Sequence, residues 1–319
     1  MVILLHIYTG GKTGGHITPI INLAKKDNDY LYIGIKGFLE EKISNENNIN
    51  FLGLEFKNIP SYIFKAYNKL NKLFKSKRIE YIFSTGGFVS LPILFYGVIH
   101  NIPIFLFEPN IIIGRTNKLF YPFCKRLLLG YPIKNKGRMV HCGIPLDINK
   151  ANPKIKYDIL IIGGSLGSRY LCELSAILNK KYKILLISGR FYDEYKDKCN
   201  TIKYSNNIYS LIEESNIVIS RAGAITASEL IYINKPFIVI PSEKTKDNHQ
   251  VINAKYFSDR KACLIHYENE GINNLYEKIH YLNNLDNYIN ITINQRRLIC
   301  NDSINKIREI IKNDICWIC

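Results

Sequence analysis

The sequence predicts an α/β protein with two Rossmann-like domains that face each other across a cleft. Short apolar or β-branched runs alternate with helix-like stretches along its 319 residues, a pattern typical of βαβ crossovers in parallel sheets covered on both faces. A glycine-rich strand-to-helix turn opens each half, at 9–16 and at 161–169. The length also exceeds the roughly 100 to 200 residues of one ordinary domain.

The predicted strands follow in a regular order. They fall at 2–8, 30–35, 79–84, 103–107 and 126–129 in the first half, and at 158–162, 183–188, 216–220 and 236–240 in the second. Between the halves, Pro145 and Pro153 lie among polar residues, and a new strand and glycine loop follow them. We therefore expect an N-terminal domain over 1–147 and a C-terminal domain over 148–319.

The composition fits a folded cytosolic protein. Hydrophobic residues make up 47% and charged residues 22% of the chain, ordinary globular values that exclude a disordered or fibrous protein. No apolar run reaches the roughly 18 residues of a membrane-spanning helix, and no signal-peptide pattern opens the chain. The widely spaced cysteines are expected to be free thiols, and no metal or cofactor site is expected.

The formal net charge is +16. Such an excess attracts phosphates, whether of nucleic acid, of anionic lipid or of a nucleotide sugar. A+T-rich codons would also produce the abundance of Asn, Ile, Lys and Tyr without selection for charge. No recognised nucleic-acid-binding motif occurs, so nucleic acid is not expected as a partner.

The first glycine-rich turn reads TGGKTGGHITP over 9–19. Glycines let a ligand approach the backbone, and the free amides of a helix start favour an anion. We expect Thr18 to cap the following helix and Pro19 to lie in its first turn. His16 lies where loop and helix meet, and an imidazole there is suited to accept a proton near neutral pH. A tight turn with an ordinary polar histidine is the alternative.

Two further turns lie in the second half. The turn IIGGSLGSR over 161–169 adds the hydroxyl of Ser165 to bare amides, and such a group can hold a diphosphate without a metal. The segment SRAGAITASE over 220–229 places Thr226 and Glu229 on one helix face. Glu229 can accept hydrogen bonds from ribose hydroxyls, and a capping box is an equally good interpretation of the same pair.

Six segments match, in order, the motifs GGTGGH, GGYVSGP, HEQNGIAGLTNK, GGSQGA, RSGALTVSE and KDRQQ of one family. They are GGKTGGH at 10–16, GGFVSLP at 86–92, FEPNIIIGRTNK at 107–118, GGSLGS at 163–168, RAGAITASE at 221–229 and KDNHQ at 246–250. Over nearly its whole length the chain thus resembles the MurG family. These bacterial transferases add N-acetylglucosamine to the lipid-linked muramyl-peptide precursor of peptidoglycan.

The resemblance implies a GT-B enzyme that inverts the sugar's anomeric centre and needs no cofactor. Its C-terminal domain would bind UDP-N-acetylglucosamine, with backbone near Ser205, Ala224 and Ile225 at uracil and phosphate, Glu229 at ribose, Ser165 at the diphosphate and Gln250 at the sugar. In the N-terminal domain, Thr13, Gly14, Gly15 and Asn110 would complete the donor pocket. His16 would deprotonate the muramyl 4-hydroxyl, with Glu108 as a second candidate base.

The implied acceptor is undecaprenyl-pyrophosphoryl-muramyl-pentapeptide, met by a peripheral protein at the cytoplasmic face of the inner membrane. Residues 61–78 have helical spacing and combine an apolar stripe with lysines. A basic amphipathic helix of this kind can lie on an anionic membrane surface. The alternative is an ordinary helix that packs its stripe on the sheet.

Three positions depart from the family pattern. Asp147 stands where the family's GNPVR motif has its arginine, and it should weaken diphosphate binding unless Arg169 or Lys12 substitutes. Phe107 and His249 replace a His and a Gln of the family motifs.

The residues Asp27-Asn28-Asp29 spell the DxD motif with which other glycosyltransferases hold a metal. The motif lies away from every glycine loop, so we expect a solvated turn.

Two other functions stay open. One is a related UDP-sugar transferase that acts on diacylglycerol or another lipid. The other is a non-catalytic, membrane-associated scaffold that retains the fold.

Overall fold

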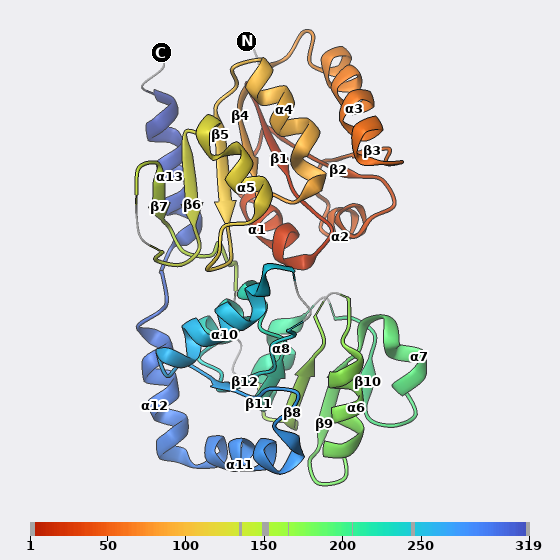
Figure 1. The fold of residues 1–319 in the computed structure, drawn as a ribbon, viewed down its shortest axis with the longest axis vertical. Coiled ribbons are helices and arrows are strands. Elements are labelled where there is room, and N and C mark those ends of the chain that lie inside the picture. Colours follow the sequence, from red (N-terminus) through yellow and green to blue (C-terminus); the bar gives the residue numbers. More distant parts are fainter. Residues whose placement is uncertain are drawn as a thin grey trace. The chain divides into compact units, whose positions relative to one another are not determined.

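The computed structural model describes residues 4–133, 136–148, 153–164, 166–205, 207–243 and 246–316. The chain forms two compact units, one of Met1–Asp147 with Cys300–Cys319 and one of Ile148–Ile299. Figure 1 shows the elements of each unit. The last segment, which we had expected in the second domain, groups with the first unit.

The first unit is built on a parallel sheet with the strand order β3-β2-β1-β4-β5-β6-β7. The strands are β1 (Leu4–Thr9), β2 (Tyr30–Ile35), β3 (Phe51–Leu54), β4 (Arg78–Ser84), β5 (Ile104–Glu108), β6 (Arg126–Leu129) and β7 (Met139–His141). The helices are α1 (Gly14–Ala24), α2 (Leu39–Glu46), α3 (Ile59–Leu73), α4 (Leu91–Ile99), α5 (Arg115–Phe120) and α13 (Ser303–Cys316), with short 3-10 turns η1 (Phe88–Ser90) and η2 (Tyr121–Phe123).

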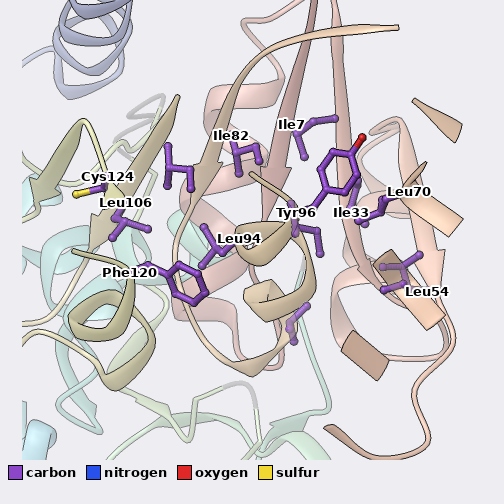
Figure 2. Close-up of a cluster of buried hydrophobic side chains, with 14 of the residues drawn as sticks. Ile7, Ile33, Leu54, Leu70, Ile82, Leu94, Tyr96, Leu106, Phe120 and Cys124 are labelled. Atoms are coloured by element: carbon purple, nitrogen blue, oxygen red, sulfur yellow. The ribbon is translucent and has the colours of Figure 1, made fainter. Parts of the chain in front are cut away.

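Helices cover both faces of this sheet. The chain runs from β1 outward to β3 at one edge of the sheet, and then from β4, on the other side of β1, outward to β6. Because the crossovers are right-handed, α1 and α2 lie on one face of the sheet and α3, α4 and α5 lie on the other. Under the second group, strand residues such as Ile7 and Ile82 pack against Leu70, Leu94 and Phe120 of the helices (Figure 2). The C-terminal helix α13 is joined to β6 by an ion pair between Arg126 and Asp314 of 2.7 Å.

The second unit has a parallel sheet in the order β10-β9-β8-β11-β12-β13. The strands are β8 (Tyr157–Ile162), β9 (Ile184–Ile187), β10 (Thr201–Ile202), β11 (Ser215–Ser220), β12 (Phe237–Val239) and β13 (Leu264–Ile265). The helices are α6 (Arg169–Leu178), α7 (Tyr192–Tyr195), α8 (Ile208–Glu213), α9 (Ala224–Ile233), α10 (His249–Asp259), α11 (Gly271–Asn283) and α12 (Leu285–Arg296), with η3 (Gly189–Phe191) and η4 (Lys246–Asn248). Its core joins β8 and β9 to α6 and α11.

The expected class of two parallel-sheet α/β domains is confirmed, and each of the nine expected strands is present. In the first sheet β1, β4 and β5 are neighbours, and in the second β8, β11 and β12 are neighbours. The loops that follow neighbouring parallel strands lie at one edge of a sheet, where ligands bind in open α/β folds. Each unit therefore gathers its motif loops at one edge.

Two helix boundaries differ from expectation. Helix α1 begins at Gly14 with Thr13 as its N-cap, so Thr18 is not the cap and Pro19 lies inside the helix. Helix α3 ends at Leu73 because Arg78 already begins β4.

The Asp27-Asn28-Asp29 segment is solvated only in part: Asn28 and Asp29 are exposed, as expected, but Asp27 is only 11% exposed at its side chain. Its carboxylate accepts a hydrogen bond from the Tyr8 hydroxyl at 2.8 Å and pairs with His6 Nδ1 at 2.8 Å. His6 Nε2 lies 2.7 Å from Glu80. The aspartate is part of an ion-pair cluster that ties the turn after α1 to β1 and β4.

Candidate functional site

The glycine loop after β1 is packed tightly against its neighbours. A Cβ atom at Gly10 would lie 1.9 Å from Thr85 Oγ1, and one at Gly11 would lie 2.6 Å from Glu40 Cδ. The Tyr32 hydroxyl donates to the carbonyl of Gly10 at 2.7 Å. These glycines are therefore required for packing, whatever the loop binds.

Helix α1 starts directly after this loop. Thr13 is its N-cap but makes no side-chain capping bond, and Gly14 and Gly15 form the start of its first turn. The backbone amides at the start of a helix lie at the positive end of its dipole. The three predicted residues therefore surround a helix start of the kind that attracts anions.

His16 is held in a defined tautomer. Its Nδ1 lies 2.8 Å from the carbonyl oxygen of Thr85, and since a carbonyl only accepts, Nδ1 carries the proton. In the neutral ring Nε2 is then the proton acceptor. The Thr85 hydroxyl donates to the backbone oxygen of His16 at 2.9 Å, and a Cβ at Gly87 would lie 3.9 Å from His16 Nε2. Thr85 thus fixes the histidine from two sides, a role that the sequence did not reveal.

Glu108 ends β5 and is only 2% exposed. Its Oε1 accepts from the backbone and side-chain amides of Asn110 at 3.1 and 3.0 Å, and its Oε2 accepts from Gly114 N at 2.7 Å and Asn117 Nδ2 at 2.9 Å. Both oxygens are thus occupied within the protein. The arrangement is typical of a carboxylate that holds a loop rather than one that accepts a substrate proton.

The predicted residues of the first unit are linked through the loop after β4. His16 touches Thr85 and Gly87, and a Cβ at Gly86 would lie 2.9 Å from the Asn117 side chain that bonds Glu108. Glu108 in turn holds Asn110.

In the second unit, Ser165 lies outside the described residues. Beside it, Gly164 has a φ of +79° and open space where a Cβ would lie, so its backbone can be approached closely. Gly167 is the opposite case, because its Cβ would lie 2.4 Å from the Ser188 carbonyl. Ser168 caps α6 through a bond from the Leu171 amide.

Arg221 joins this loop to its neighbours. Its Nε donates to Ser168 Oγ at 3.0 Å, and its Nη1 donates to the Ile240 carbonyl at 3.0 Å and pairs with Glu268 at 2.6 Å. The loops after β8, β11 and β12 are thereby fixed to one another. Arg221 belongs to the RAGAITASE motif, which by itself did not indicate this role.

Helix α9 begins at Ala224 behind Gly223, which has no side chain to cap it. The backbone amides of Ala224, Ile225 and Thr226 lie at this helix start, where the helix dipole favours an anion. A capping box requires a Ser or Thr at the N-cap, whereas Thr226 and Glu229 lie inside the helix. The capping-box interpretation of this pair is wrong.

Glu229 is 8% exposed. Among the described residues its hydrogen-bond partner is the Tyr209 hydroxyl, at a long 3.3 Å. Burial raises the pKa of Glu229 to about 7, against a smaller opposite effect of that hydrogen bond. A buried carboxyl with so few donors is suited to accept hydroxyl groups from a ligand.

The remaining predicted residues lie on separate loops. Gln250 is in the first turn of α10, where its Oε1 accepts from the Ser242 amide at 2.9 Å. Ser205 lies between β10 and α8 and accepts from the Asn207 amide at 3.1 Å. No direct hydrogen bond between described residues joins either one to Glu229.

Arg169 and Lys12 are the expected substitutes for the motif arginine that Asp147 replaces. Each of them already contacts a neighbouring side chain. Asp147 pairs with Lys26 at 3.6 Å on the surface. Arg169 makes an ion pair with Glu194 at 2.9 Å, and Lys12 Nζ lies 5.3 Å from the Phe88 ring centre.

In the part of the chain that the structure describes, no group of three or more His, Cys, Asp or Glu side chains could hold a metal ion. The same residues include no helix both long and apolar enough to cross a membrane.

Comparison with known proteins assigns the family. Residues 6–129 match the glycosyltransferase family 28 N-terminal domain, and residues 158–307 match the glycosyltransferase family 28 C-terminal domain. A Clostridium botulinum (strain Alaska E43 / Type E3) protein named UDP-N-acetylglucosamine--N-acetylmuramyl-(pentapeptide) pyrophosphoryl-undecaprenol N-acetylglucosamine transferase is 32% identical, over 97% of this chain and 98% of its own. A Thermosipho melanesiensis protein of the same name is 31% identical, over 88% of this chain and 92% of its own.

Solved structures share the fold. The crystal structure of Acinetobacter baumannii MurG matches with a TM-score of 0.77 at 19% identity, over 97% of this chain and 99% of that one. The glycotransferase of kitacinnamycin matches with a TM-score of 0.74 at 12% identity, over 99% of this chain and 100% of that one. With the family domains and the close relatives, the chain belongs to glycosyltransferase family 28 and, within it, to the MurG transferases.

Proposed function

We propose that this protein moves N-acetylglucosamine from UDP-N-acetylglucosamine to the 4-hydroxyl of lipid-linked N-acetylmuramyl-pentapeptide, a step of peptidoglycan synthesis. The observation that carries the proposal is the site after β11. There the start of α9, where the N-cap residue Gly223 makes no side-chain capping bond, suits a phosphate, and the buried Glu229 with one long hydrogen bond suits a ribose. The names of the near full-length relatives support the same donor and acceptor.

In this proposal the second unit binds the donor. Glu229 accepts the ribose hydroxyls, the amides of Ala224, Ile225 and Thr226 with Ser165 meet the phosphates, and Ser205 and Gln250 contact the uracil and sugar ends. Arg221 lies beside the Ser168 end of the phosphate loop.

The first unit supplies the acceptor side and the base. His16 Nε2 takes the proton of the acceptor hydroxyl as the hydroxyl oxygen attacks the anomeric carbon. The new glycosidic bond forms while the bond to the diphosphate breaks, UDP leaves, and the anomeric configuration inverts. Glu108 is not the base in this scheme, because four hydrogen bonds from Asn110, Gly114 and Asn117 occupy it. It holds Asn110 in place.

The test is a transfer assay. The purified protein, incubated with labelled UDP-N-acetylglucosamine and a short-chain muramyl-lipid acceptor, is expected to yield a labelled lipid product. Transfer to diacylglycerol alone would establish the related lipid transferase instead. Donor binding without transfer to either lipid would establish the non-catalytic scaffold.

We further propose that the protein binds the cytoplasmic face of the inner membrane through helices α3, α4 and α5. The stripe of α3 packs inward through Tyr62, Ala66 and Leu70, as for an ordinary helix, but Phe64 stays 69% exposed. Other apolar side chains exposed on this side are Ile59, Phe95, Ile99, Leu119 and Phe123. Exposed lysines of the same helices are Lys65, Lys69, Lys72 and Lys118. Apolar groups ringed by cations suit an anionic leaflet. No nucleic acid is proposed as a partner.

A further inference from the structure

Glu40, in the first turn of α2, is a buried carboxylate to which no role has yet been assigned. It is 0% exposed. Its Oε2 accepts the Lys12 amide at 3.0 Å, and its Oε1 accepts the Ile35 amide at 3.2 Å. Neither oxygen is paired with a cation from the described part of the chain. Burying such a charge is unfavourable unless hydrogen bonds compensate it, so these two amides and the start of α2 must satisfy it.

The carboxylate lies directly against the glycine loop. A Cβ at Gly11 would come within 2.6 to 2.8 Å of Glu40 Cδ and both of its oxygens. The next residue, Lys12, has a φ of +75°, a left-handed conformation that side chains other than glycine rarely adopt. The hydrogen bond from Lys12 to Glu40 therefore holds a strained residue in place.

The strained residue sets the start of α1. Thr13 follows Lys12 as the N-cap, and its carbonyl accepts the amide of His16 at 3.0 Å. The position of His16 thus follows from the backbone of Lys12 through one helical turn. Relative to the family motif GGTGGH, this loop has one extra residue. A longer loop needs an additional contact to keep its conformation, and Glu40 supplies one.

We propose that Glu40 is a positioning residue for the transfer reaction: it fixes the loop 10–13 so that His16 stands where it can take the acceptor's proton. The inference rests on the proposed role of His16. It assigns Glu40 no contact with either substrate.

Glu40→Gln tests the proposal, because the amide keeps the shape of the side chain but presents an NH2 donor to one of the two backbone amides. We expect kcat to fall about tenfold or more while the dissociation constant of UDP, bound by the other unit, stays within about twofold. Hydrogen exchange of the Lys12 amide should become roughly tenfold faster or more. If Glu40→Gln does not fold, Glu40→Asp, which keeps the charge but retracts the oxygens, should give the same results.

The matched control is Glu41→Gln. Glu41 is the next residue of α2 and also accepts a backbone amide, that of Gly37 at 2.6 Å, away from the glycine loop. The Glu41→Gln substitution is expected to leave kcat and the hydrogen exchange of the Lys12 amide unchanged.

A second variant separates positioning from general stability. Glycine adopts the left-handed conformation without strain, so Lys12→Gly in the Glu40→Gln background should recover kcat about threefold or more. Unchanged kcat and unchanged Lys12 exchange in Glu40→Gln would overturn the proposal. An inactive wild-type protein would instead count against the proposed function, and the exchange of Lys12 would still decide the role of Glu40.

Discussion

Glu229 combines burial with a shortage of hydrogen-bond donors. Burial raises its pKa from an ordinary value of 4.5 to about 7, so the folded state binds a proton more tightly than the unfolded state does. Its stabilising effect is full below pH 4.5 and is lost as the pH rises through about 7. A ligand whose hydroxyl groups donate to the ionised carboxylate would offset the unfavourable burial of its charge. Nucleotide binding is therefore coupled to the ionisation of Glu229.

Glu229→Gln should therefore weaken UDP binding and stabilise the ligand-free protein at the same time. We expect a loss of about 1 to 3 kcal/mol of UDP binding free energy at pH 8, because an NH2 donor replaces one of the two oxygens that accept from the ribose hydroxyls. Relative to wild type, the variant should gain more stability against unfolding at pH 8 than at pH 5, by up to about 3 kcal/mol. Calorimetric titration and urea unfolding measure the two effects.

The control is Glu277→Gln, which changes an exposed carboxylate on α11 of the same unit. It should leave UDP affinity unchanged and show no such dependence of stability on pH. Equal UDP affinity for Glu229→Gln and wild type would remove Glu229 from the ribose site.

His16→Ala should lower turnover by roughly a hundredfold or more with little change in donor affinity, as expected for the loss of a general base. The measurement is kcat with saturating acceptor, together with the dissociation constant of UDP. His100→Ala, which removes the histidine at the C-cap of α4 that bonds Asn71, should leave both values unchanged. A His16→Ala enzyme with wild-type turnover would exclude this histidine as the base.

At the level of helices and strands, the sequence identified the central strands and missed the outer ones. The strands without a prediction are β3, β7, β10 and β13, which form the two edges of each sheet. An edge strand is covered on fewer sides, so it needs no continuous apolar run. β10 and β13 are also only two residues long. Hydrophobic pattern therefore reveals the middle of a parallel sheet better than its margins.

The start of α1 was placed wrongly for a different reason. A Thr-Pro pair is a good local signal for a helix start, yet the helix begins earlier, at Gly14. The loop before it is held by Tyr32 and Glu40, which are distant in sequence. The same limit applies to the site. Motifs located the predicted residues, whereas Thr85 and Tyr209, which bond His16 and Glu229, lie outside these motifs.

Helix α3 carries a prediction about membrane binding. Phe64→Ser should reduce binding to vesicles that contain anionic lipid several-fold, because it removes a large apolar side chain that is 69% exposed and lies among lysines. Co-sedimentation with vesicles at fixed salt measures this. Leu285→Ser on α12, which is also 69% exposed but lies in the other unit, is the matched control and should bind as wild type does. Equal binding of both variants would contradict the proposed membrane surface.

On the scale of the whole molecule, the first unit has a cluster of polar side chains away from its motif loops. Motif residues gather at the carboxyl ends of the strands, whereas the cluster of His6, Asp27 and Glu80 ties together the turn after α1 and the first residues of β1 and β4. Tyr8 and Tyr81 complete this cluster, with their hydroxyls 3.1 Å apart. The cluster thus contributes to stability in the first unit, away from the loops assigned to the reaction.

The pH dependence of this cluster follows from its two titrating partners. Burial alone would lower the pKa of His6, but the hydrogen bonds and charges of Asp27 and Glu80 outweigh it and raise the pKa above 6.5. Burial alone would raise the pKa of Asp27, but bonds from His6 and Tyr8 outweigh it and lower the pKa below 3.8. The contribution of His6 is full below pH 6.5 and is lost as the pH rises through its raised pKa. That of Asp27 is present above pH 3.8 and is lost on further acidification.

His6→Asn should therefore destabilise the first unit more at pH 5.5 than at pH 8.5, by about 1 kcal/mol, since the groups are partly exposed and screened. Native-state hydrogen exchange of the β1 and β4 amides measures the free energy of opening in this unit alone. His280→Asn, at an exposed position near the end of α11, should show the same small effect at both pH values. An effect of His6→Asn that does not change with pH would mean that packing of the ring on Tyr81, at 4.4 Å between centroids, rather than its charge, stabilises this end of the sheet.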